Sequence, residues 1–175
     1  MLRRLLLLAL LCSASPGWSR DKTENWVEVR SEHFIVATNS SEKKARQIAD
    51  QFERMRAVFH KALPKLQIDP GDPIIVLAVK DEKDFRSLEP AAYLAKGQVK
   101  VAGLFLHALD KNYVLLRVDA EGEHPYEVVY HEYTHLLLAK SADWMPLWMN
   151  EGLAEFYQNT DIREKDVALG QLPIA

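Results

Sequence analysis

The sequence predicts an α+β domain in which a twisted sheet is backed by helices. Three observations predict it: short segments of alternating or continuous apolar residues that are typical of strands, one long segment with helical periodicity, and two later apolar segments that each begin at a proline. Strands and a helix come first, then further strands, then two helices. The chain has 175 residues, 48% of them hydrophobic, which favours one domain with a proper core.

The first half of the chain predicts two strands, a long helix and a buried strand. Residues 26–38 alternate in polarity on either side of a turn-prone Ser-Glu pair, which indicates two short strands. After the capping residues 39–41, apolar residues recur at helical spacing up to Leu63. The continuous apolar run 74–79 predicts a strand that is covered on both faces.

The second half predicts a short helix and two strands, followed by two helices joined by a turn. Proline suits the first turn of a helix because its missing N–H would have no partner there. The expected segments are a helix at 81–88, strands at 97–107 and 112–118, a helix at 126–140 behind Pro125, and a helix at 147–157 behind Pro146.

Residues 1–19 have the order of a secretory signal peptide. A basic start is followed by an apolar run and then by small and polar residues. The apolar run is too short to form a stable membrane-spanning helix. We expect cleavage after Ser19 or after Ala14, and a secreted or periplasmic mature domain that comprises residues 20–175.

Cys12 is the only cysteine of the chain. If the signal peptide is removed, the mature chain can form no disulfide and no cysteine-ligated metal site. A lipoprotein anchored through Cys12 is the less favoured alternative, because Leu11 is bulkier than that processing usually tolerates. The formal net charge of −3, without a basic stripe, disfavours nucleic acid as a partner.

The most informative segment is His131-Glu132-Tyr133-Thr134-His135, an H-E-x-x-H run within an apolar stretch that reads as helix. Histidines four residues apart face the same side of a helix, so both imidazoles can bind one Zn²⁺. Glu132 would then act as the general base on a metal-activated water. A catalytic zinc usually has three protein ligands, and Glu151, on a helix that returns after a turn, is the predicted third.

Two further residues near Glu151 are candidates for supporting roles. Glu155 lies one helical turn beyond it, where its carboxylate can accept the outer N–H of a ligand histidine. Tyr157 is a conceivable oxyanion donor, whereas Tyr133 is expected to face away from the site. Structural roles are expected for the remaining histidines, which are His33, His60, His107 and His124.

The H-E-x-x-H run and the segment Trp148-Met149-Asn150-Glu151-Gly152-Leu153-Ala154-Glu155 resemble the gluzincin metallopeptidases, the superfamily of thermolysin and related aminopeptidases. They are most similar to the peptidase MA-like domains of secreted bacterial proteins. The resemblance implies a zincin-like fold with an active-site helix and a third-ligand helix. It also implies that His131, His135 and Glu151 bind Zn²⁺, with Glu132 as base and Glu155 orienting His131. A substrate-binding edge strand should precede the motif helix, for which residues 112–118 are the candidate.

The function implied by this resemblance is a secreted zinc-dependent peptidase that hydrolyses peptide bonds of peptides or proteins. Two alternatives remain open: a non-catalytic zincin-like binding module of a larger secreted protein, and an amidase acting on cell-wall peptides. The segment between His135 and Glu151 is shorter than the one usual in gluzincins, and twenty residues follow Glu155. We therefore expect a C-terminal lobe that is short or truncated.

Overall fold

The computed structural model describes residues 25–65, 71–93, 101–107, 111–120, 126–141 and 144–171. The predicted signal peptide with Cys12, and also His124 and Pro125, lie outside the described residues. The described part has a mixed α+β fold, as the sequence predicts. Its elements are β1 (Val27–Arg30), β2 (Phe34–Thr38), α1 (Glu42–Ala62), β3 (Ile74–Val79), α2 (Glu82–Leu88), β4 (Gly103–His107), β5 (Asn112–Arg117), α3 (Glu127–Ser141), α4 (Leu147–Gln158), β6 (Asp161–Ile162) and β7 (Val167–Ala168).

Five strands form one mixed sheet in the order β1-β2-β3-β5-β4. The three central strands β2, β3 and β5 run parallel, and β1 and β4 pair antiparallel with the strands next to them. Parallel neighbours need a crossover connection, and α1 supplies it between β2 and β3. The strands β6 and β7 form a separate small antiparallel pair after α4.

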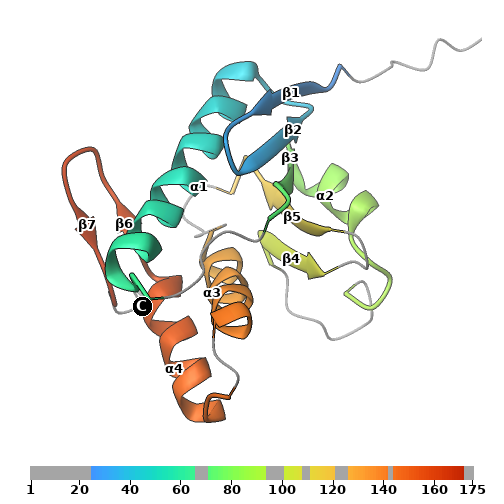
Figure 1. Cartoon of the computed structure of the whole chain (residues 1–175). Helices are drawn as coiled ribbons and strands as arrows, with labels where there is room; N and C mark the ends of the chain where they lie inside the picture. Colours follow the sequence, from blue (N-terminus) through green and yellow to red (C-terminus); the bar gives the residue numbers. More distant parts are fainter. Residues whose placement is uncertain are drawn as a thin grey trace, which may run out of the picture.

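Helices cover both faces of the sheet, and alternate residues of the central strands serve the two faces. Val76 and Val114 are register partners that are buried in the larger core with residues of α1 and α3. The next residues along these strands, Leu77 and Leu115, face the smaller core around Phe85 of α2. Figure 1 shows α1 and α2 on opposite sides of the sheet. The prediction that β3 is buried on both faces is therefore confirmed in part: one face is fully buried, whereas Ile75 and Leu77 on the other face are half-buried.

Helix α1 carries the apolar stripe that the sequence predicts. Its N-cap is Ser41, whose side chain accepts a hydrogen bond from the backbone N–H of Lys44 at 3.3 Å. The stripe packs aromatic rings against the sheet and the later helices, with ring centroids of Phe52 and Phe34 5.1 Å apart and those of Phe59 and Tyr157 4.6 Å apart. The buried residues of α1 are Ala45, Ile48, Ala49, Phe52, Met55 and Phe59.

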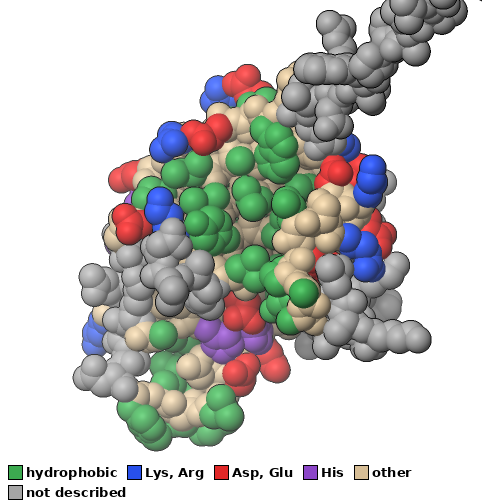
Figure 2. All heavy atoms as spheres, turned by 90° about the vertical axis from the view of Figure 1, so that its right-hand side faces the viewer, with side chains coloured by type: hydrophobic (Ala, Val, Ile, Leu, Met, Phe, Trp, Pro, Cys, Tyr) green, Lys and Arg blue, Asp and Glu red, His purple; other side chains and the backbone are tan. Residues whose placement is uncertain are grey.

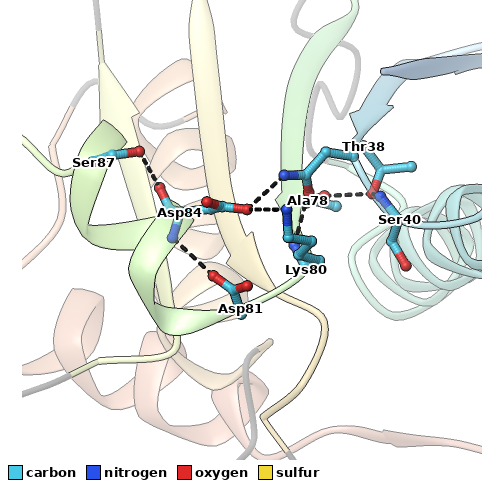
Figure 3. A network of polar contacts seen from close by, with 8 residues as sticks. Thr38, Ser40, Ala78, Lys80, Asp81, Asp84 and Ser87 are labelled. Atoms are coloured by element: carbon cyan, nitrogen blue, oxygen red, sulfur yellow. Dashed lines mark hydrogen bonds and ion pairs between the residues drawn. The ribbon is translucent and has the colours of Figure 1, made fainter. Parts of the chain in front are cut away.

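A polar network joins the C-terminal ends of β2 and β3 to α2 (Figure 3). Asn39 donates a hydrogen bond from Nδ2 to Asp84 Oδ2 at 2.6 Å, and its Oδ1 accepts one from the backbone N–H of Lys80 at 2.9 Å. The Lys80 ammonium lies 3.1 Å from the same Asp84 oxygen. The hydrogen bond from Asn39 and the contacts with Lys80 lower the pKa of Asp84. Asp81 caps α2 through the backbone N–H of Asp84. The network therefore fixes α2 to the residues that follow β2 and β3.

The predicted elements and the observed ones agree in kind and differ at some bounds. The strand predicted at 97–107 is observed as β4 from Gly103, and residues 94–100 lie outside the described part of the chain. The β6–β7 pair is absent from the prediction because two-residue strands leave no readable alternation in a sequence. Across the described residues, no helix is long and apolar enough to cross a membrane.

Candidate metal centre

Helix α3 packs one side against the larger core, and this packing fixes the direction of the polar side chains on its other side. Val129, Tyr130, Tyr133 and Leu137 are buried in the larger core together with residues of the sheet and α1. Edge-to-face contacts of the Tyr133 ring with the rings of Phe34 and Phe59, at centroid distances of 6.3 and 5.8 Å, fix the rotation of the helix. Tyr133 thus faces the core, as predicted. The side of α3 left half-buried carries His131, Glu132 and His135.

Helix α4 packs against α3 and brings Glu151 to the two histidines. Its residues Ala154 and Tyr157 are buried on the packed side, which sets the direction in which the other faces point. The Glu151 side chain is 48% exposed, and the side chains of His131 and His135 are 21% and 23% exposed. The three side chains therefore meet at the surface. Figure 2 shows histidine side chains there between acidic ones.

The three donor atoms have the mutual spacing that a small divalent cation requires. His131 Nε2 and His135 Nε2 are 3.1 Å apart, and Glu151 Oε2 lies 3.5 Å from each. A point about 2.1 Å from all three atoms, the usual length of zinc bonds to imidazole and carboxylate, lies about 0.8 Å above their plane. The three atoms are therefore close enough together for one such ion to bind all of them.

The hydrogen bonds on the outer ring nitrogens leave lone pairs facing the centre of this group. The side-chain carbonyl of Asn150 lies 2.5 Å from His135 Nδ1, and that of Gln158 lies 3.0 Å from His131 Nδ1. A carbonyl oxygen can only accept, so each Nδ1 carries the proton and, in a neutral imidazole, each Nε2 is left as an acceptor. Two such lone pairs and the Glu151 carboxylate repel one another unless a cation or a proton lies between them. The donor set and its spacing fit Zn²⁺.

Gln158 and Asn150 contact the two ligand histidines and were not predicted from the sequence. The position predicted for the Glu155 carboxylate, at the outer nitrogen of His131, is taken by the Gln158 amide. Glu155 is exposed and has no hydrogen bond or ion pair with another described residue. A signal for Gln158 was present, because it lies seven residues after Glu151, which is two helical turns on the same face.

The two remaining predicted site residues lie in different surroundings. Glu132 is half-buried on α3 and directly follows His131 in the sequence, and its role as base stays a prediction. Tyr157 is 4% exposed in the larger core, where its ring packs against Phe59. Burial raises the pKa of Tyr157. The packed position of its ring lends no support to a role as oxyanion donor.

The edge strand next to the motif helix is β4, and the prediction that residues 112–118 form it is wrong. β5, which covers most of that segment, lies between β3 and β4 within the sheet. The reason is that β4 folds back antiparallel on the outer side of β5, so the strand nearest in sequence to α3 is enclosed. β4 is the outermost strand on this side of the described sheet and lies beside α3.

The other histidines lie apart from the metal-binding group or outside the described side chains. His33, before β2, donates its backbone N–H to Glu53 Oε1 at 2.9 Å, and its Nδ1 lies 2.9 Å from Glu53 Oε2. His60 is exposed in the last turn of α1. The His107 side chain and the whole of His124 are not among the described parts. Among the described residues, His131, His135 and Glu151 form the only group of three or more metal-ligating residues.

No protein-family model matches the chain, and no curated protein sequence matches it.

Proposed function

We propose that the protein is a secreted zinc-dependent hydrolase that cleaves peptide bonds. The observation that carries the proposal is the convergence of His131 Nε2, His135 Nε2 and Glu151 Oε2 at mutual distances of 3.1–3.5 Å on a surface open to solvent. Structural zinc sites usually have four protein ligands, whereas catalytic ones have three and leave a position for water. Three ligands at an accessible surface favour catalysis. The predicted gluzincin relationship and zincin-like fold form part of this proposal.

The residues of the chain divide the chemistry between them. His131, His135 and Glu151 would hold Zn²⁺, and Asn150 and Gln158 would keep both imidazoles in the tautomer that binds it. When bound, zinc supplies Lewis acidity, which lowers the pKa of a coordinated water to about 7 and polarises a carbonyl group. Glu132 would take a proton from the attacking water as a new C–O bond forms. It would then return that proton to the nitrogen that leaves as the C–N bond breaks.

A peptide rather than another acyl compound is proposed because of the strand beside the motif helix. β4 is the outer strand of the described sheet on the side of α3. Outer strands expose backbone N–H and C=O groups that can pair with an extended peptide. A peptide bound along β4 would run past the helix that carries His131 and His135. The secreted location is proposed from the signal-like residues 1–19.

The decisive experiment compares the zinc-loaded protein with its Glu132→Gln variant on a peptide library read by mass spectrometry. We expect equal zinc content, because Glu132 is not a ligand. We expect the cleavage rate to fall by about 10²–10⁴-fold, the usual contribution of a general base. A variant that retains full activity would remove the mechanism. Bound zinc without turnover on any peptide would favour the binding module, and cleavage confined to cell-wall peptides would favour the amidase.

A further inference from the structure

We infer that exposed apolar side chains at the start of α4 select peptides with a large apolar residue next to the bond that is cleaved. The inference rests on the proposed function, because it assigns a substrate class to the same site. The side chains are those of Trp144, Leu147 and Trp148, here called the α4 apolar rim. Their exposed fractions of 80%, 75% and 76% are the highest among the exposed large hydrophobic residues of the described chain.

Two side chains of the α4 apolar rim lie on the helix face that carries the ligand residue Glu151. Leu147 and Trp148 precede Glu151 by four and three residues, so their side chains lie on the same face of α4 as the Glu151 carboxylate. The N-terminal end of α4 forms the lower end of the molecule in Figure 1, and Figure 2 shows hydrophobic side chains there below the histidines. Leu147, Trp148 and the ligand residue Glu151 thus lie on the same side of α4.

The distance between rim and ligand matches the repeat of an extended peptide. Four residues, or just over one helical turn, separate Leu147 from Glu151 and rise about 6 Å. An extended peptide rises about 3.3 Å per residue. A substrate whose carbonyl oxygen lies at the metal-binding group therefore places the side chain one or two residues away against Leu147 and Trp148. Leu147 and Trp148 would therefore affect which peptide binds, without contacting the bond that breaks.

The chemistry of the rim decides which side chain it accepts. The segment Trp144-Met145-Pro146-Leu147-Trp148-Met149 contains no charged residue. Single exposed apolar residues are ordinary on protein surfaces, whereas several together mark an interaction site. A phenylalanine or leucine side chain of the substrate would cover part of this surface, and serine would gain nothing there. Partial burial of such a side chain strengthens binding by about tenfold.

The test measures peptide binding to the full zinc-loaded chain that carries Glu132→Gln, so that hydrolysis does not deplete the probe. Two fluorescein-labelled heptapeptides, identical except for a central phenylalanine or serine, are compared by fluorescence anisotropy. The same measurement is made after adding Trp148→Ala or Leu147→Ser. Both side chains are largely exposed, so truncating them leaves the core intact. Trp26→Ala is the matched control, because Trp26 is 44% exposed and precedes β1 at the opposite end of the molecule.

We expect the phenylalanine peptide to bind about tenfold more tightly than the serine peptide. The preference should fall below about twofold in Trp148→Ala and in Leu147→Ser and persist in Trp26→Ala. No preference, or a preference that survives both rim variants, would overturn the inference. So would rim-dependent binding to phosphatidylcholine vesicles without peptide preference, which would assign the surface to a membrane.

The outcomes separate this inference from the proposed function. Rim-dependent preference in binding, without hydrolysis by the wild-type protein, would support the inference as a statement about peptide recognition and contradict the hydrolase. Hydrolysis of both peptides at equal rates by the wild-type protein would leave the hydrolase in place and overturn the inference.

Discussion

The affinity of the metal site should depend on Gln158, a residue that does not touch the metal. Its Oε1 lies 3.0 Å from His131 Nδ1 and fixes the ring proton on the outer nitrogen. Gln158→Ala removes that acceptor, so the imidazole also populates the tautomer that cannot bind zinc. Losing a partner of this kind lowers metal affinity by about 10–100-fold. We expect about tenfold, the lower end, because His131 is partly exposed and water can replace the amide.

Glu155→Ala is the matched control on the same helix. Glu155 is exposed and has no hydrogen bond or ion pair with another described residue, so its loss should change zinc affinity by less than about twofold. Both affinities are measured near neutral pH by competition with a chromophoric chelator, with circular dichroism to confirm folding. A larger loss for Glu155→Ala than for Gln158→Ala would refute the assignment. It would restore the carboxylate that the sequence had suggested.

Three further predictions concern other parts of the molecule. Gly170→Ala should lower the free energy of unfolding in a denaturant titration by about 1–2 kcal/mol, because Gly170 has φ +61 and an aromatic ring lies where its Cβ would go; unchanged stability would contradict this. Burial raises the pKa of the Glu53 carboxyl, but hydrogen bonds from Ser31 and from His33 outweigh burial and lower that pKa below 4.5. The ionised carboxylate therefore stabilises the fold fully above pH 4.5, and this stabilisation is lost as the pH falls through the lowered pKa. The free energy of unfolding, measured at several pH values, should therefore depend less on pH below pH 4.5 in Glu53→Gln than in the wild-type protein. An identical pH dependence in the two proteins would disprove the contribution of Glu53. Tyr157→Phe should retain the cleavage rate within about twofold, whereas the loss of an oxyanion donor would cost about 10²–10³-fold.

The sequence was sufficient to predict an element, and the direction of its side chains, wherever helical spacing placed those side chains on one face. The stripe of α1 ends in the core because its apolar positions share a helix face, and Ser41 begins the helix by capping it. The same reasoning predicted that His131 and His135 would project together, since residues four apart in a helix cannot do otherwise. Placing Glu151 beside them required only a turn and a returning helix, which the two prolines indicated.

The sequence was insufficient wherever the answer depended on how elements pack in space. The order of β4 and β5 in the sheet follows from a reversal of the chain, and strand patterns alone do not say which of two neighbours lies outside. The choice between Glu155 and Gln158 depends on where α4 crosses α3, because both residues lie near the face of Glu151. Tyr157 was assigned by its chemistry, whereas the packing of α4 places it in the core.

The most direct test of the metal centre is zinc-edge X-ray absorption on the full chain, together with zinc content for the wild-type protein and Glu151→Ala. We predict one zinc per chain with about four nitrogen or oxygen neighbours at about 2.0–2.1 Å, two of them with the outer scattering of imidazole. Glu151→Ala should bind zinc far more weakly. Zinc surrounded by six oxygen atoms, or bound equally well without the Glu151 carboxylate, would contradict a centre built from His131, His135 and Glu151.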